Sequence, residues 1–154
     1  MLHVVLVEPE IHWNTGNAGR TCLAAGAQLH LVAPLGFSLD DKEVRRAGLD
    51  YWDRVAPRVW PDWDTFERAL PFLGTPYLFT SRAVGRFQEI AYARPAVMIF
   101  GRESVGLDPQ ILARHAEHTV AIPMLDPALR SLNLSTSVAL ALYEARRQWG
   151  WRVE

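Results

Sequence analysis

The stretch LHVVLVEP, residues 2–9, decides the fold class of this chain. It is an apolar run rich in β-branched residues that ends at a proline, which is typical of a buried β-strand. Strands whose residues are apolar almost throughout, without strict alternation, are covered on both faces, as in a parallel sheet. The stretch therefore favours an α/β protein.

Further apolar runs alternate with helical patterns along the chain. The runs are QLHLVAP (28–34), TPYLFTS (75–81), RPAVMIFG (94–101) and HTVAIPM (118–124). Helices are expected at 17–27, 38–48, 62–70, 107–117 and 130–150. Asp62 or Asp64 would cap the third helix, and Asp108 the fourth, with Pro109 in its first position. The alternation predicts a mostly parallel sheet with helices on both faces.

Composition limits what the protein can be. With 154 residues, 49% of them hydrophobic, we expect a single domain, 1–154, with a substantial core. No apolar run approaches the roughly 20 residues of a membrane span, and no signal peptide is evident, so we expect a cytoplasmic protein. Cys22 is the single cysteine and is expected in the core, with no metal site. The formal net charge of −1 means that nucleic-acid binding would require a local basic patch.

Two segments that follow predicted strands carry unusual polar groups. In EPEIHWNTGNAGR (8–20), Asn14 supplies an amide, and Arg20 follows about one helical turn into the next element. In FGRESVGLD (100–108), Glu103 lies just beyond a strand end, between two glycines. Taken alone, the first segment could be an ordinary capped helix start and the second a plain turn.

A third segment, IPMLDPALRSLNLS (122–135), follows the last predicted strand. Its prolines keep it out of regular helix, so its backbone groups are free for a ligand. Ser131, Asn133 and Ser135 together exceed the one or two side chains that capping the last helix requires. Because ligands of parallel α/β sheets bind beyond the carboxyl ends of the strands, the three segments are expected to form one site.

The same segments carry a family resemblance. NTGNAGR, FGRESVGL and IPMLDPALRSLNLSTSVALALYE resemble the three motifs of the SPOUT class of RNA methyltransferases, which are α/β proteins with a deep trefoil knot. The resemblance spans nearly the whole chain. The stretches HVVLVEPEI and DDKEVRRAGLDYWD are most similar to the single-domain tRNA 2′-O-methyltransferases that act on the wobble nucleotide. The resemblance implies a carboxyl-terminal knot and S-adenosylmethionine as cofactor. It also implies the tRNA anticodon stem-loop as partner, and a homodimer with each active site at the subunit interface.

The resemblance also implies roles for individual residues. Arg20 and Asn14 would serve the acceptor ribose, and Glu103 and Asn133 would complete the catalytic group. The cofactor would lie against Phe79, Thr80, Gly101, Ile122, Ser131 and Leu132. No membrane or metal partner is implied. The expected reaction is methylation of a ribose 2′-hydroxyl in tRNA, at cytidine or uridine 34.

Two positions depart from the family pattern. His12 and Trp13 precede Asn14 where relatives often have proline or small residues, and Val105 occupies a position that is often Lys or Arg. Alternatives are a 2′-O-methyltransferase for another tRNA or rRNA site, a non-catalytic knotted RNA-binding relative, and a flavodoxin-like nucleotide-binding regulator. No G-x-G-x-x-G follows the first strand and no P-loop is present, which disfavours conventional dinucleotide or triphosphate binding.

Overall fold

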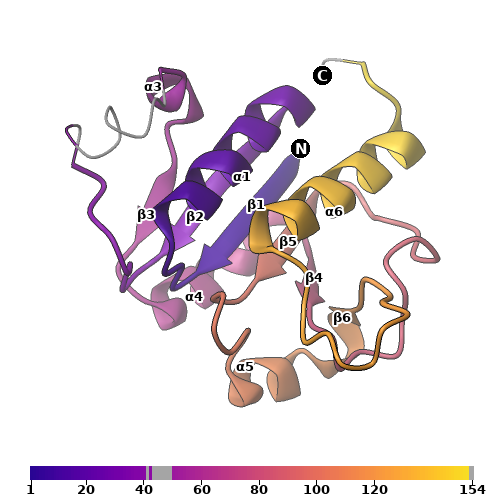
Figure 1. The fold of residues 1–154 in the computed structure, drawn as a ribbon. Coiled ribbons are helices and arrows are strands. Elements are labelled where there is room, and N and C mark those ends of the chain that lie inside the picture. The colour runs from indigo at the N-terminus through magenta and orange to yellow at the C-terminus, as the bar shows by residue number, and fades with distance from the viewer. Residues whose placement is uncertain (41, 43–49, 153–154) are drawn as a thin grey trace.

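The computed structural model describes residues 1–40, 42 and 50–152, and its strands form one parallel sheet (Figure 1). The strand order is β3-β2-β1-β5-β4-β6, and every pairing is parallel. The strands are β1 Leu2–Val7, β2 Ala27–Val32, β3 Arg58–Trp60, β4 Thr75–Phe79, β5 Ala96–Phe100 and β6 Thr119–Val120. The predicted α/β class with a parallel sheet is confirmed.

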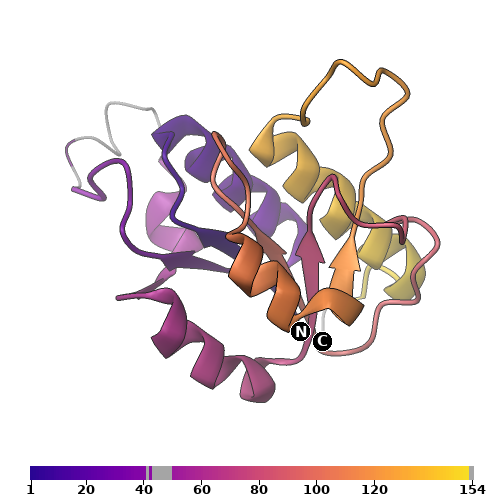
Figure 2. The ribbon, with the colours of Figure 1, turned by 90° about the horizontal axis from the view of Figure 1, so that it is seen from below.

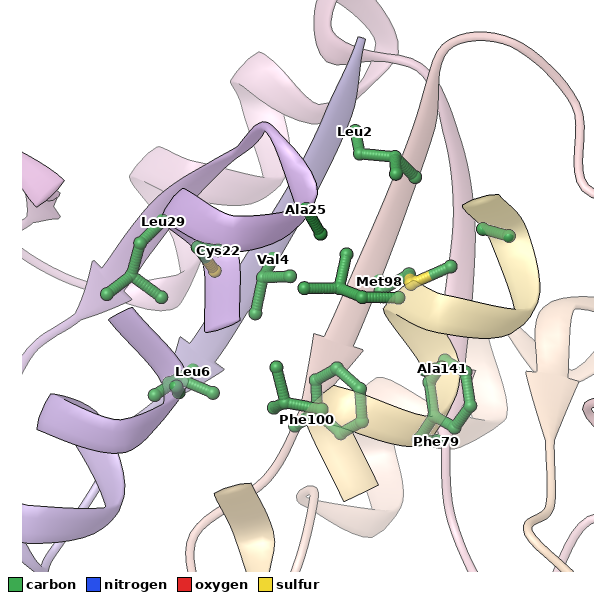
Figure 3. Packing of buried hydrophobic residues seen from close by; sticks show 14 of the residues in the cluster. Leu2, Val4, Leu6, Cys22, Ala25, Leu29, Phe79, Met98, Phe100 and Ala141 are labelled. Carbon is green, nitrogen blue, oxygen red and sulfur yellow. The ribbon is translucent and has the colours of Figure 1, made fainter. Parts of the chain in front are cut away.

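Strand β1 is buried on both faces, as its apolar sequence predicts. Leu2, Val4 and Leu6 point into one core, together with Met98 and Phe100 of β5 (Figure 3). Val5 and Val7, which alternate with them, belong to a second core on the opposite face. Two separate cores require helices on both sides of the sheet.

The helices supply that cover. On one face, α1 (His12–Ala25) and α6 (Leu134–Trp149) lie side by side in front of the sheet in Figure 1. On the other face, α4 (Trp63–Leu73) and α5 (Pro109–Arg114) bury Phe66 and Ile111 in the second core. A short helix, α3 (Trp52–Val55), packs on α1, and a 3-10 turn at Ala116–His118 precedes β6.

Several helix ends agree with the sequence. Asp62, and not Asp64, caps α4 by accepting a hydrogen bond from the backbone N–H of Thr65 at 2.7 Å. Asp108 caps α5 in the same way, with Pro109 in the first helical position. The helix expected at 38–48 falls largely outside the described residues. Among the described residues, no helix has both the length and the apolar character that a membrane crossing requires.

Other boundaries differ from the prediction. Strand β3 and helix α3 were not expected, because β3 is a three-residue edge strand flanked by Pro57 and Pro61. Strand β6 covers two residues of the apolar run 118–124, since Pro123 cannot donate to a ladder. Helix α1 begins at His12, before the predicted start at residue 17, so Asn14 lies inside the helix.

The chain crosses from the edge of the sheet back to its centre between β6 and α6. The segment 80–95 contacts the start of this crossover and the far end of α6. The N–H of Ala121 donates to the carbonyl of Gly85 at 2.7 Å, and the indole N–H of Trp149 donates to the carbonyl of Tyr92 at 2.9 Å. These contacts fix the path of the carboxyl-terminal half, for which the knot stays a prediction.

Candidate active site

A cavity of about 1080 Å³ lies beyond the carboxyl ends of the central strands. Figure 2 shows the loop 101–108 and the loop 122–133 on this same side of the sheet. Every residue to which we assigned a role, with the exception of Arg20, lines the cavity: Asn14, Phe79, Thr80, Gly101, Glu103, Ile122, Ser131, Leu132 and Asn133. The three polar segments therefore meet, as predicted.

Three of these side chains form a hydrogen-bonded row. The amide nitrogen of Asn133 donates to the amide oxygen of Asn14 at 3.0 Å, and the amide nitrogen of Asn14 donates to a carboxylate oxygen of Glu103 at 3.3 Å. Asn14 is 3% exposed, so its two polar atoms depend on these partners. Each of the three residues comes from a different polar segment, so the row fixes their relative positions.

Glu103 also completes the start of α1. Ile11 is the N-cap residue of α1 and has no side-chain acceptor for the free N–H groups. The carboxylate of Glu103 instead holds the two residues that lead into the helix, accepting hydrogen bonds from the N–H groups of Glu10 at 2.8 Å and Ile11 at 3.2 Å. A negative charge at a helix N-terminus is stabilising. The geometry therefore gives Glu103 a positioning role in the start of α1.

A second contact joins the same two loops in the opposite direction. The carboxylate of Glu10 accepts hydrogen bonds from the N–H of Ser104 at 3.1 Å and from its hydroxyl at 2.6 Å. These bonds, the hydroxyl first, hold the pKa of Glu10 below its usual value. The loop before α1 and the loop 101–108 are thus joined by two carboxylates, one from each loop, that accept hydrogen bonds from the other loop. Glu10 and Ser104 were not singled out from the sequence, because neither position has a recognisable motif alone.

The polar start of α6 has two functions. Asn133 is the N-cap of α6, and its side-chain oxygen accepts from the N–H of Thr136 at 3.2 Å and from the hydroxyl of Ser135 at 2.6 Å. Its amide nitrogen remains available for Asn14. Ser131 and Leu132 line the cavity immediately before the helix. The polar groups that capping does not need therefore face the cavity or tie α6 to α1.

Gly101 is required by the close approach of the loop to itself. A Cβ atom at this position would lie 2.1 Å from both the carbonyl carbon of Gly106 and the backbone nitrogen of Leu107. No side chain fits that space, because the obstacle is backbone. Gly106 has a φ of +73°, which favours glycine. The turn that presents Glu103 thus depends on both glycines of the second motif.

Arg20 lies apart from the cavity of the single chain. It is exposed on α1, and its guanidinium carbon lies 5.6 Å from the centre of the Tyr51 ring. The hydroxyl of Tyr51 donates to the carbonyl of Gly16 at 3.1 Å, which anchors the ring against α1. The single chain therefore brings together Asn14, Glu103 and Asn133, but it does not bring Arg20 to them.

The cavity wall contains further residues outside the predicted catalytic and cofactor-binding sets. Arg82 and Arg130 line it, and Trp63 and Asp64 line the part next to α4. The signal available for Arg82 was its place two residues beyond Thr80, just after a strand end. Trp60, in contrast, packs in the core, with its ring stacked on His30 at 6.1 Å.

The two departures from the family pattern are both on the surface. Trp13 is 59% exposed, with the His12 ring edge-on to it at 4.8 Å. Val105 is 68% exposed on the wall of the cavity. Arg102, next to it, reaches within 3.9 Å of Glu8.

Comparison with known proteins follows this geometry. The profile of the SpoU rRNA Methylase family matches residues 1–143. A tRNA (cytidine(34)-2'-O)-methyltransferase of Burkholderia pseudomallei is 49% identical over 153 residues, which is 98% of this chain and 97% of that protein. A structure described as "Structural insights into the 2-OH methylation of C/U34 on tRNA" has a TM-score of 0.90 and 43% identity, covering 99% of this chain and 98% of the other. An AdoMet-bound rRNA methyltransferase from Sinorhizobium meliloti has a TM-score of 0.80 and 30% identity, covering 95% of this chain and 56% of the other.

Proposed function

Since the chain belongs to the SpoU methylase family, we propose that it transfers a methyl group from S-adenosylmethionine to a ribose 2′-hydroxyl of tRNA, at the wobble nucleotide, position 34. The observation that supports this best is the row Asn14–Glu103–Asn133, which joins the three family motifs at one cavity. The relatives named for cytidine 34 match this chain nearly from end to end, which favours the wobble position over other sites.

The residues of the cavity suit the proposed cofactor. The volume of the cavity, about 1080 Å³, slightly exceeds the roughly 300–1,000 Å³ of small-molecule pockets, which leaves room for a nucleotide beside the cofactor. Phe79, Ile122 and Leu132 offer apolar surface for an adenine ring. Thr80 and Ser131 offer hydroxyl groups to its polar parts. When bound, S-adenosylmethionine supplies a methyl group that a nucleophile can attack directly.

The protein would then act chiefly by positioning. Holding an attacking oxygen in line with its target can contribute roughly 7–11 kcal/mol. Asn14 is fixed on both sides by Glu103 and Asn133, so the start of α1 forms a rigid wall for the acceptor ribose. The ribose hydroxyl must also lose a proton. Arginine cannot take it, because its guanidinium group stays protonated in proteins. We assign Arg20 to the adjacent phosphate, where its charge lowers the pKa of the hydroxyl and a phosphate oxygen or water takes the proton.

This role of Arg20 requires a second subunit. We propose a homodimer in which Arg20 of one protomer completes the cavity of the other. Apolar side chains exposed on α6 support such a contact, since Leu140 is 39% and Tyr143 47% exposed. Trp151 is 56% exposed and lies 5.0 Å from the Tyr143 ring. Helix α1, which carries Arg20, packs along α6, so docking on this pair of helices would bring Arg20 into an interface.

The test combines cells and purified protein. Nucleosides of tRNA from cells lacking the protein should lose one 2′-O-methyl group, mapped by mass spectrometry to position 34. The purified protein with labelled S-adenosylmethionine should restore the label at that nucleotide. A Lys replacement of Arg20 serves as the inactive control. Loss of a methyl group from rRNA, or from another tRNA position, would contradict the proposed substrate. The proposed reaction, 2′-O-methylation, would still stand.

A further inference from the structure

Two arginines on the cavity wall have no charge partner among the described residues. Arg82 follows β4, and Arg130 precedes α6, so they come from distant parts of the chain. Both are exposed and both line the cavity. Within the described part of the chain, neither guanidinium group makes a hydrogen bond or an ion pair.

Hydrogen bonds order the backbone at Arg82 and in the turn just before Arg130. The N–H of Arg82 donates to the hydroxyl of Thr80 at 3.3 Å, and the N–H of Thr80 donates to the carbonyl of Val120 at 2.9 Å. Before Arg130, the carboxylate of Asp126 accepts from the N–H of Ala128 at 2.8 Å, which closes a turn. The backbone of Arg82 is thus held directly, and Arg130 follows a hydrogen-bonded turn.

The acidic groups of the same wall are mostly engaged elsewhere. Glu8 faces Arg102, Glu103 accepts three hydrogen bonds at the start of α1, and Asp108 caps α5. Asp64 lies on the part of the wall next to α4. The wall thus offers positive charge at Arg82 and Arg130 that no ion pair with residues 1–40, 42 or 50–152 neutralises.

The chemistry of the proposed ligands indicates what this charge binds. The methyl donor carries a sulfonium, an ammonium and one carboxylate, so it is cationic overall and gains little from two more cations. An RNA strand whose ribose enters the cavity brings a phosphate on each side of that ribose. Guanidinium groups suit phosphate oxygens, because their N–H donors bind two oxygens at once. The formal net charge of −1 makes such a local contact necessary for RNA binding.

We propose that Arg82 and Arg130 bind the backbone phosphates on either side of the acceptor nucleotide. The inference rests on the proposed function for the identity of the RNA. It assigns a substrate-binding role to residues outside the row Asn14–Glu103–Asn133. The donor's carboxylate is the competing anion, and the experiment separates the two.

The experiment uses the full chain with Arg82→Gln, Arg130→Gln and both changes, and an unmodified tRNA transcript as the probe. Affinity for the transcript is measured at several salt concentrations. Each change should weaken binding about tenfold and lower the slope of log K against log salt by about 0.7, the value for one single-stranded phosphate contact. The donor's Kd, measured by calorimetry, should stay at the wild-type value.

Two controls keep the result specific. The double change Arg82→Lys with Arg130→Lys keeps both charges and should retain the wild-type salt slope. Arg68→Gln removes an exposed arginine from α4, outside the cavity wall, and should leave both affinity and slope unchanged. Thermal unfolding checks that all variants are folded.

Two results would overturn the assignment. One is wild-type affinity and slope in the double Gln variant. The other is a weaker donor Kd with unchanged RNA binding, which would give the arginines to the donor's carboxylate. Mapping the methyl group on the same transcript tests the proposed function separately. If the methyl group is found at another nucleotide while the Gln variants still show a reduced salt slope, position 34 is refuted and the phosphate contacts are retained.

Discussion

The side chains of Asn133 and Asn14 share a hydrogen bond of 3.0 Å across 119 residues of sequence. Asn133 is also the N-cap of α6, so one amide both starts a helix and joins it to α1. The amide of Asn14 continues the row to Glu103. The positions of three loops thus depend on the amide groups of Asn14 and Asn133. Substitutions can test the role of each amide separately.

Asn133→Asp separates the capping of α6 from the hydrogen bond that joins α6 to α1. Asp is as good an N-cap as Asn, but it has no amide nitrogen to donate to Asn14. We expect the free energy of unfolding to stay within about 0.5 kcal/mol of the wild-type value while methyl transfer falls about a hundredfold. Asn133→Ala should lose activity and also about 1 kcal/mol of stability. Urea unfolding and a labelled-methyl assay measure both, and full activity in the Asp variant would contradict the joining role.

Glu103→Gln tests the contribution of this carboxylate at the start of α1. The replacement removes the negative charge and one of the two acceptor oxygens that serve the N–H groups of Glu10 and Ile11. We expect a loss of about 2 kcal/mol in the free energy of unfolding, the scale of hydrogen bonds to a charged group. Glu117→Gln, at a carboxylate whose side chain is 71% exposed, is the control. Unchanged stability together with a weaker donor Kd would instead assign Glu103 to cofactor binding.

Mixed dimers test whether Arg20 acts across subunits. Arg20→Lys alone should abolish most turnover and leave the donor's Kd near normal. Asn133→Ala should be inactive for a different reason. If the sites are shared, mixing the two inactive variants produces dimers with one intact site, and activity returns to a substantial fraction of that of the wild type. Activity that does not return in verified mixed dimers would place Arg20 and Asn133 in the same subunit's site.

The buried pair His3 and His30 predicts a loss of stability in acid. The indole N–H of Trp60 donates to Nδ1 of His30 at 3.1 Å, so the ring proton of neutral His30 is on Nε2, which lies 2.9 Å from Nδ1 of His3. Burial first, then the charges of His3 and Arg58, lowers the pKa of His30 from 6.5 to about 3.

The sign of the pH effect follows from these values. Below pH 6.5 the unfolded chain binds a proton at His30 that the folded chain does not, so stability is full above this pH and falls toward pH 3. The contribution of His30 approaches about 1.4 kcal/mol per pH unit. His30→Gln should show a correspondingly shallower dependence of unfolding free energy on pH. Equal slopes in the two proteins would show that His30 is protonated in the folded state.

Gly101→Ala should disrupt the loop that carries Glu103. Its Cβ would meet backbone atoms at 2.1 Å, so the turn must open. We expect a loss of several kcal/mol, roughly the upper range of single substitutions, and loss of donor binding. Gly85→Ala is the matched control, because the nearest heavy atom to its Cβ would be 3.7 Å away. Calorimetric unfolding of both variants measures the difference.

Sequence alone determined most of the long elements and much of the site. Apolar runs such as 2–9 identified the buried strands, because a strand covered on both faces has little room for polar residues. Asp108 with Pro109 marked a helix start through local backbone chemistry. The positions of Asn14, Glu103 and Asn133 after strand ends were sufficient to predict that they meet, since those ends share one edge.

Tertiary structure alone decided which hydrogen bonds and charge contacts these groups form with one another. The acceptor for the N–H groups that lead into α1 comes from Glu103, far along the chain, and no local pattern predicts an acceptor from so distant a residue. Edge strand β3 formed because β2 offered it a partner, although its three residues carry almost no signal of their own. The free charge of Arg82 and Arg130 likewise depends on which carboxylates other contacts have engaged. Local patterns select elements, but hydrogen bonds and charges are satisfied only in three dimensions.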